Sequence, residues 1–306
     1  MLKKVITVRQ EKEKEYVVCN NCGSNQPVKC FIIQGFQIVD CAQCGLRYVN
    51  PRLTADAINV LYTIDYFKSD DSVVYGYDDY IAEHDTIIKT FQKRWNGLSG
   101  YLPTTGSMLD IGAACGFLME VAKFNGWQSR GLEVSADMAK VGRDKYGHDI
   151  LVGALTNPKL QPSSYDLITM WDTIEHSPDP IGDLKRIEIL LKPGGVLSLI
   201  TPDSGSLHAK IFGSKWVEYQ RPQEHIYFFS HQLLETILKQ NGFEIVWSGT
   251  AGKYVSWKFA LNRLRCYWPG LIKVAEWIMK RAGIYETFTY IDPKDKMSIV
   301  ARKKKE

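Results

Sequence analysis

The stretch that decides the fold is Met108–Phe117, MLDIGAACGF, near the middle of the 306-residue chain. A short apolar run leads into a loop of small residues, and an amphipathic stretch follows. Small residues at such a turn let the backbone pass close to a ligand, because no large side chain stands in the way. The pattern therefore predicts a strand, a glycine-containing loop and a helix. An ordinary strand–helix turn gives the same pattern, and so does the turn of a dinucleotide-binding fold.

Strands and helices are predicted to alternate from about residue 107 onward. Short apolar runs predict strands at 108–111, 129–134, 167–171, 196–201, 243–248 and 297–301. Amphipathic stretches predict helices at about 116–126, 135–147, 180–191 and 230–241. This alternation is typical of an α/β fold with a mainly parallel sheet and helices on both faces.

Four landmarks in this region resemble, in order, those of class I S-adenosylmethionine (SAM) dependent methyltransferases. Asp110-x-Gly112-x-x-x-Gly116 resembles the first motif of the family, and Glu133 follows 21 residues after Gly112. The stretches 165–172 and 190–195 resemble the fourth strand of the family and the turn before its fifth strand. Four ordered matches over ~90 residues favour this family over the two alternatives. The resemblance implies a Rossmann-like sheet and SAM as the cofactor.

The resemblance also implies which residues bind SAM. Gly112 would let the backbone approach, Asp110 would orient the loop and the ammonium end, and Glu133 would accept hydrogen bonds from the ribose hydroxyls. The middle glycine of the usual loop is Ala114 here, which is still small. Adenine is expected near residues 153–155. The complete predicted set is Asp110, Gly112, Ala114, Gly116, Glu133, Ala154, Leu155 and Asp172.

Two Cys-x-x-Cys pairs lie near the N-terminus, and a glycine follows each pair. Cys19 and Cys22 form the first pair, and Cys41 and Cys44 form the second, with 18 residues between the pairs. Two such turns supply four soft ligands in a tetrahedron, which suits zinc. A closed site of this kind would be structural, because it leaves no open position for chemistry. The alternatives are two redox pairs or free cysteines that pack.

The flanking segments resemble a subgroup of the family. A four-cysteine ribbon, then Tyr48–Pro51, a SAM domain and Pro222–Ser230 are together similar to the ribbon-bearing methyltransferases of bacterial sugar and surface-glycan pathways. The last segment is also similar to one in ubiquinone-type O-methyltransferases. We expect a lead-in and zinc ribbon at 1–50, a helical linker or lid at 51–105, and a methyltransferase domain at 106–306 with a helical insertion at 252–295.

The resemblance implies methyl transfer to a small molecule, at a hydroxyl or carbon of a nucleotide-linked or lipid-linked sugar or glycan precursor. The Asn-Pro-Pro-Tyr type motif of base-amine methyltransferases is absent, since Met170–Asp172 stands in its place. A zinc-ribbon rRNA or tRNA methyltransferase is the second hypothesis, and a non-catalytic SAM-domain binding protein is the third. The formal net charge of +4 counts against nucleic acid, and the intact SAM motifs count against a non-catalytic domain.

Two histidines are candidate general bases for an acceptor hydroxyl. His176 and His225 each follow an acid and fall on loops at the predicted carboxyl edge of the sheet. The acceptor is expected between the loop at 172–180, the segment at 216–228 and the 252–295 insertion. A structural role for either histidine is the alternative. Asp172, Glu175 and His176 also form a grouping that can bind a divalent ion, although a solvated helix start is the simpler interpretation.

The remaining patterns concern location and partners. The chain has no apolar run long enough to span a membrane, and residues 1–15 lack the apolar core of a signal peptide, so we expect a cytoplasmic protein. Aromatic and basic residues interleave over 252–282, which suits a membrane surface or a helical cap with solvated lysines. Tyr75, Tyr77 and Tyr80 are candidates for a lid over the cofactor, or for packing of a helix.

Overall fold

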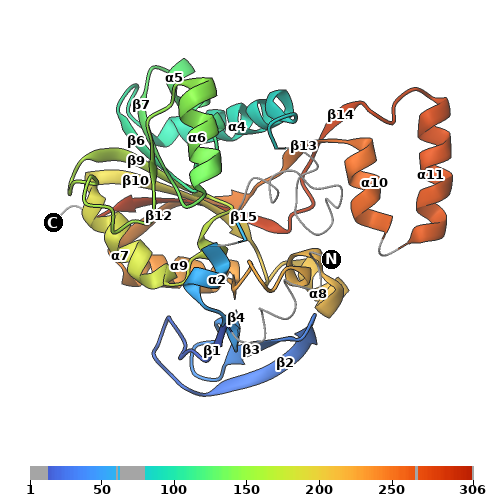
Figure 1. The fold of residues 1–306 in the computed structure, drawn as a ribbon, viewed down its shortest axis with the longest axis horizontal. Coiled ribbons are helices and arrows are strands. Elements are labelled where there is room, and N and C mark those ends of the chain that lie inside the picture. Colours follow the sequence, from blue (N-terminus) through green and yellow to red (C-terminus); the bar gives the residue numbers. More distant parts are fainter. Residues whose placement is uncertain (1–12, 60, 63–79, 266–267, 305–306) are drawn as a thin grey trace.

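The computed structural model describes residues 13–59, 61–62, 80–265 and 268–304 (Figure 1). Its centre is a seven-stranded sheet with the strand order β12-β15-β10-β9-β6-β7-β8. Neighbouring strands from β8 to β10 are parallel, and β15 is antiparallel to both of its neighbours. Helices α4, α5 and α6 lie on one face, and α7 and α9 lie on the other (Figure 1). The predicted α/β, Rossmann-like fold is therefore confirmed.

The strands of this sheet follow the predicted apolar runs closely. They are β6 (Ser107–Ile111), β7 (Gln128–Glu133), β8 (Ile150–Val152), β9 (Tyr165–Trp171), β10 (Leu191–Pro202), β12 (Phe243–Thr250) and β15 (Lys296–Lys303). Strand β8 was not predicted from the sequence, because three residues are too few to show a hydrophobic periodicity. The apolar residues of β9 and β10 are buried almost continuously, as expected for strands that are covered on both faces.

The four predicted helices are all present, and local capping explains where three of them begin. Ser135, Asp179 and Ser230 each accept a hydrogen bond from a backbone N–H in the first turn that follows. The longer helices are α4 (His84–Leu98), α5 (Phe117–Phe124), α6 (Ala136–Tyr146), α7 (Pro180–Leu190), α9 (His231–Gln240), α10 (Trp257–Arg265) and α11 (Pro269–Arg281). Shorter ones are α2 (Ala55–Asn59), α8 (Leu207–Phe212) and the 3-10 turns Ser99–Tyr101, Ile174–His176, Gly213–Lys215 and Val217–Gln220.

A four-stranded sheet carries the cysteine-containing segment. Its order is β11-β4-β3-β2, formed by β2 (Pro27–Ile33), β3 (Phe36–Cys41), β4 (Arg47–Val49) and β11 (Tyr227–Phe228). Strand β11 belongs to the C-terminal half of the chain and pairs antiparallel with β4. A smaller pair joins β1 (Lys14–Glu15) to β5 (Arg52–Leu53). The segment predicted as a separate ribbon thus shares a sheet with the C-terminal half of the chain.

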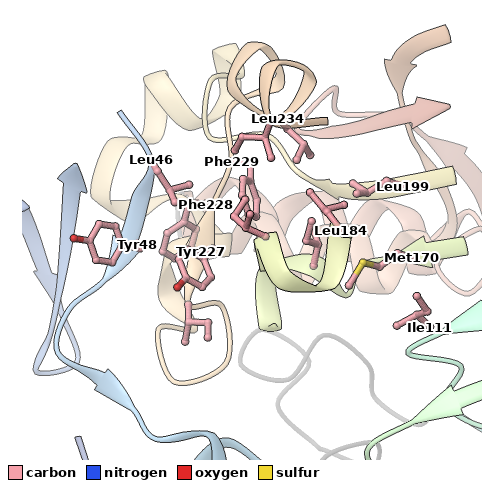
Figure 2. Packing of buried hydrophobic residues seen from close by; sticks show 14 of the residues in the cluster. Leu46, Tyr48, Ile111, Met170, Leu184, Leu199, Tyr227, Phe228, Phe229 and Leu234 are labelled. Atoms are coloured by element: carbon pink, nitrogen blue, oxygen red, sulfur yellow. The ribbon is translucent and has the colours of Figure 1, made fainter. Parts of the chain in front are cut away.

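The two sheets also share one hydrophobic core. Figure 2 shows Tyr48 and Leu46 of the ribbon beside Tyr227 and Phe228, with Leu184 of α7 further into the same cluster. The Tyr48 and Tyr227 rings stack with their centroids 6.2 Å apart. Because these residues are buried together, the ribbon is held against the α/β core by packing as well as by backbone hydrogen bonds.

The insertion at 252–295 is only partly helical. Strands β13 (Lys253–Ser256) and β14 (Phe288–Ile291) pair antiparallel, and α10 and α11 lie between them as a hairpin that projects from the body (Figure 1). The predicted helical insertion contains two helices, and the strand pair at its base was not predicted, because four-residue strands are hidden by their interleaved aromatic and basic residues. Of the helices in the described part of the chain, none is long and apolar enough to cross a bilayer.

Candidate active site

The glycine loop follows β6 and leads directly into α5. Gly112 has φ +75°, and a Cβ at this position would lie 2.4 Å from Oγ1 of Thr173. Gly116 has φ +90°, and a Cβ there would lie 2.4 Å from the ring of His148. Both positions therefore require glycine for conformation and for space. We call the loop backbone at 112–114 the cradle, and it borders the cavity described below.

Two buried carboxylates flank the loop at the ends of adjacent strands. Glu133 accepts hydrogen bonds from the backbone N–H groups of Ala114 and Ser135, both at 2.8 Å. Each carboxylate oxygen keeps a second lone pair for a ligand hydroxyl. Asp110 accepts a hydrogen bond of 2.7 Å from the Thr169 hydroxyl. Burial raises the pKa of Asp110 to about 7 and also raises the pKa of Glu133.

A cavity of about 470 Å³ opens beside this loop at the carboxyl edge of the sheet. The predicted SAM residues that line it are Asp110, Gly112, Ala114, Glu133, Ala154, Leu155 and Asp172. Gly116 is absent from the lining, since it starts α5 behind the loop. Both candidate bases, His176 and His225, line the same cavity. The structure thus brings the two halves of the predicted site together.

The two histidines lie against each other at the end of the cavity. Their ring centroids are 4.6 Å apart and the ring planes are nearly perpendicular, at 88°. His176 Nδ1 lies 3.0 Å from the Glu224 carbonyl oxygen and 2.9 Å from the Tyr62 hydroxyl. Because a carbonyl only accepts, Nδ1 carries the hydrogen and Nε2 is left as an acceptor. Tyr80 also lines the cavity, whereas Tyr75 and Tyr77 fall outside the described residues.

Burial keeps both imidazoles neutral. Burial and the nearby Arg221 guanidinium lower the pKa of His176 to about 3. Burial, Arg221 and His176 together hold the pKa of His225 well below its usual range. Nδ1 of His225 has no hydrogen-bond partner among the residues that the structure describes. Neutral rings can accept a proton, although a lowered pKa makes this less favourable than for a free imidazole.

Behind His225 lies a buried carboxylate that the sequence analysis missed. Glu218 is fully buried and pairs with Arg221 at 2.7 Å and with Arg263 at 3.2 Å. Its carboxylate oxygen lies 3.5 Å from Nδ1 of His225. Burial opposes ionisation, but Arg221 and Arg263 hold the pKa of Glu218 well below its usual range. The anion would stabilise a proton that arrives on His225.

Asp172 and Glu175 differ in charge although they are near neighbours. Asp172 pairs with Lys296 at 2.6 Å and lies 4.0 Å from Arg94; despite its burial, these cations lower its pKa. Burial and the Asp172 charge raise the pKa of Glu175 to about 8, and Glu175 accepts a hydrogen bond from Thr201. Asp172 was predicted to bind SAM, but in the structure its carboxylate is paired with a lysine.

The residues suggested for a divalent ion, Asp172, Glu175 and His176, are not the set that the structure brings together. The ligand atoms of Glu175, His176 and His225 lie within 4.8 Å of one another, and Asp172 is not part of the group. Arg221 and Lys296 add positive charge near this group, and that charge disfavours the binding of a metal cation.

Cationic side chains from distant segments also line the cavity. Arg221, Lys253, Arg263 and Lys296 all reach it. Burial, with Arg263 and Lys296 nearby, lowers the pKa of Lys253 to about 7. Lys253 and Arg263 belong to the aromatic and basic segment that was predicted as a solvated cap or a membrane surface. Their composition gave no signal that they turn inward.

The four cysteines converge as predicted. Sγ of Cys19 lies 3.5 Å from Sγ of Cys44, and Cys22 and Cys41 are separated by the same distance. A zinc tetrahedron with bonds of about 2.3 Å has sulfur–sulfur edges of ~3.8 Å, so these ligands fit the ion. Gly23 and Gly45 follow the two pairs with positive φ, which permits the tight turns. Cys30 is exposed and lies outside this group.

The cysteine-containing segment contacts the candidate site directly. The backbone N–H of Val49 donates to the Ile226 carbonyl, and the N–H of Ile226 donates to the Glu175 carbonyl, both at 3.0 Å. Asn20, between the first two cysteines, donates to the Asp179 carboxylate at 2.8 Å. Ile226 follows His225 directly in the sequence, so the ribbon fixes the backbone at one histidine and near the other.

Comparisons with known proteins agree with this geometry. Residues 83–248 match the family described as "Methyltransferase domain". A ubiquinone biosynthesis O-methyltransferase of Xanthomonas campestris is 32% identical over 100 residues, which is 31% of this chain and 42% of that protein. The equivalent protein of Bordetella pertussis is 29% identical over 157 residues, covering 46% of this chain and 65% of that protein. The chain thus matches about two fifths to two thirds of the length of these relatives.

Solved structures show the same fold. A SAM-dependent methyltransferase from Archaeoglobus fulgidus superposes with a TM-score of 0.51 at 18% identity, over 73% of this chain and 99% of that one. A SAM-dependent methyltransferase from Thermotoga maritima gives a TM-score of 0.50 at 21% identity, over 74% and 93%. The matched family spans more than half of the chain, including the glycine loop, Glu133 and strands β8 to β11. The chain therefore belongs to the family described as a methyltransferase domain and has the fold of these SAM-dependent methyltransferases.

Proposed function

We propose that the enzyme transfers the methyl group of SAM to a hydroxyl of a small-molecule acceptor. The observation that carries this proposal is the layout of the cavity. The cradle at Gly112 and the acid Glu133 lie in its wall, and so does the buried His176–His225 pair. The region at Gly112 and Glu133 suits a nucleoside with a ribose diol, and the region at the two histidines suits a hydroxyl group that must lose its proton. The curated relatives are named as O-methyltransferases, which agrees with oxygen as the acceptor atom.

The chain's residues divide the binding of SAM among them. Glu133 would accept hydrogen bonds from the ribose hydroxyls, the Gly112 backbone would approach the amino-acid part, and Asp110 would face its ammonium group. Ala154 and Leu155 follow β8 and would lie against the adenine. Asp172 lines the cavity and would orient Lys296 through its Oδ1, and its other oxygen could still face SAM. When bound, SAM supplies a methyl group already activated on a positively charged sulfur.

His225 would be the general base. The acceptor oxygen forms a bond to the methyl carbon as the sulfur–carbon bond breaks, and the hydroxyl proton moves to the neutral imidazole. Glu218, whose carboxylate lies 3.5 Å from Nδ1 of His225, would stabilise the positive charge of the protonated ring. His176, held by the Glu224 carbonyl, would orient the acceptor or take the same role through a water molecule. The remaining contribution is the positioning of the two reactants in the cavity.

The charges of the cavity favour an acceptor with an anionic group. Lys253 lies close to Arg263 and Lys296, and these cations lower its pKa. A phosphate or carboxylate on the acceptor would offset that repulsion. A nucleotide-linked or lipid-linked sugar fits this requirement, in line with the subgroup resemblance, and a phenolic acid like those of quinone pathways fits it too. The four cysteines would hold a structural zinc ion that fixes the ribbon.

The test measures transfer of labelled methyl from SAM to nucleotide sugars, lipid-linked sugars, phenolic acids and RNA. We expect a methyl ether on an anionic hydroxylated acceptor. His225→Ala should lower turnover by about 100- to 10,000-fold while SAM affinity barely changes. His231→Ala is the matched control, since His231 begins α9 and pairs with Glu235. Methylation of RNA alone, or full turnover in both His225→Ala and His176→Ala, would contradict the proposal.

A further inference from the structure

The α10–α11 hairpin carries an apolar face that no other element of the described residues covers. Helix α11 packs on α10 and projects away from the sheet (Figure 1). Ile272 is the buried residue of α11. The exposed fractions of its other large apolar side chains are 71% for Leu271, 57% for Val274, 58% for Trp277 and 53% for Ile278. A contiguous apolar face of this kind marks a site of interaction.

The spacing places these residues on one side of the helix. They occur at i, i+3, i+6 and i+7, which is the spacing of a single helical face. Lys273 and Arg281 border this face and are exposed. The Arg281 guanidinium lies over the Trp277 ring, 4.7 Å from its centroid. Aromatic and aliphatic side chains bordered by cations are typical of helices that lie in the headgroup region of a bilayer.

The insertion carries a net positive charge. Residues 252–295 contain eight Lys and Arg and four Asp and Glu. Glu276 already pairs with Arg265 and accepts a hydrogen bond from Tyr285. The exposed Lys258, Lys273 and Arg281 are therefore in excess. A surface that covers this face without repulsion has to be negative.

The hairpin is also fixed to the body. The Trp268 ring at the start of α11 contacts the Phe212 ring of α8, with the centroids 6.0 Å apart. Strands β13 and β14 pair with each other at its base and connect it along the chain to β12 and β15 of the main sheet. The apolar face is thus held in one orientation.

We propose that this face of α11, formed by Leu271, Val274, Trp277 and Ile278, docks the enzyme on an anionic lipid surface. A second copy of the chain fits less well, because a symmetric pairing of α11 with itself would bring Lys273 and Arg281 of the two copies together. Anionic headgroups complement these cations, and the acyl boundary covers the apolar residues. The docking does not depend on which acceptor is methylated.

If α11 docks on a membrane, the opening through which an acceptor could enter the main cavity would lie close to the lipid surface. A second cavity of about 230 Å³ lies at the base of the hairpin, lined there by Lys258, Phe259 and Phe288. It shares Phe91, Asp172, Lys253 and Lys296 with the main cavity. An amphiphilic acceptor could therefore reach the catalytic residues from the lipid surface along the hairpin.

Flotation of the full chain with lipid vesicles tests the proposal. The wild type should float with phosphatidylcholine vesicles that contain phosphatidylglycerol, and should stay behind with pure phosphatidylcholine. Leu271→Ser with Trp277→Ser should reduce binding about tenfold or more, because the apolar anchors are lost. Lys273→Glu with Arg281→Glu should reduce vesicle binding by at least about fivefold per charge, and this reduction should be smaller in high salt.

Two matched variants keep the test specific. Phe124→Ser and Lys123→Glu change an exposed apolar and an exposed basic residue at the end of α5, away from the hairpin, and should float like the wild type. Circular dichroism and thermal melting check that every variant folds. No flotation of the wild type overturns the proposal, and so does equal flotation of all variants. A wild-type dimer that becomes monomeric in Trp277→Ser, without vesicle binding, assigns the face to a second copy instead.

Discussion

Asp110 is the residue whose charge depends most directly on the state of the cofactor site. Burial raises its pKa to about 7, so at neutral pH the free protein holds it partly protonated. The ammonium group of SAM would favour the ionised form, so binding releases a proton below pH 7. We therefore expect SAM affinity to rise about tenfold per pH unit below the pKa and to level off above it.

Calorimetry of SAM binding at pH 6, 7 and 8, in two buffers that differ in ionisation enthalpy, measures this effect. Asp110→Asn should remove both the proton release and the pH dependence. The stability of the free protein has the opposite sign: the folded state holds a proton that the unfolded state has lost, so the free energy of unfolding falls as pH rises from about 4 to 7. A pH-independent SAM affinity in the wild type would refute the proposed role.

Gly112 gives a second prediction at the level of one residue. Gly112→Ala puts a Cβ at a position with φ +75°, 2.4 Å from the Thr173 hydroxyl. The left-handed conformation alone costs about 1–2 kcal/mol, and the clash adds to it. We expect a lower melting temperature and a loss of SAM binding. Gly97→Ala is the control, because a Cβ there meets nothing within 4 Å and should stabilise α4 by about 0.5–1 kcal/mol. Equal effects of the two changes would contradict this account.

At the level of elements, the ribbon supports the catalytic loops. Strand β4 pairs with β11, and β11 follows His225 after one residue. We predict that Cys41→Ser loses about one zinc per chain and lowers turnover up to about 100-fold, because small displacements of a catalytic group are costly. SAM affinity should change little, since Glu133 and Gly112 lie on other elements.

Metal analysis, turnover and SAM calorimetry are measured together for this variant. Cys30→Ser is the control, because Cys30 is exposed and outside the cluster. Full zinc content in Cys41→Ser would refute the metal site. Loss of zinc with unchanged turnover would leave the metal site standing and refute the coupling.

The elements also show what the sequence could and could not predict. The long strands β9 and β10 are buried over nearly their whole length, so their apolar runs were unmistakable. Strand β11 has two residues and exists only because β4 lies beside it. Strands β13 and β14 depend in the same way on their partners across 31 intervening residues. Pairing between distant short segments leaves no local period, so it escaped prediction.

The same distinction applies to the site. The SAM side was predicted residue by residue, because the loop and Glu133 lie within one strand–helix–strand unit. The acceptor side was predicted only through His176 and His225. Arg221, Lys253 and Lys296 reach the cavity from three separate segments. A buried cation looks like a solvated one in the sequence, because its burial is decided by tertiary packing.

On the scale of the whole molecule, three parts meet at one cavity. The α/β domain supplies the glycine loop and Glu133, the ribbon fixes the backbone around His225 and Asp179, and the insertion supplies Lys253 and Arg263. The proposed cofactor side is lined mainly by the α/β domain, whereas the proposed acceptor side also receives residues from the insertion and is held in place by the ribbon. Changes to the ribbon or the insertion should therefore alter turnover more than SAM affinity.

The central claim is that this cavity binds SAM through Glu133, and calorimetric titration of SAM tests it most directly. Glu133→Ala should weaken binding by about 1.5–3 kcal/mol, the contribution of hydrogen bonds to a charged group. Glu244→Ala, at an exposed acid on β12, should bind like the wild type. A wild type that binds NAD but not SAM, or a Glu133→Ala variant with unchanged SAM affinity, would contradict the account.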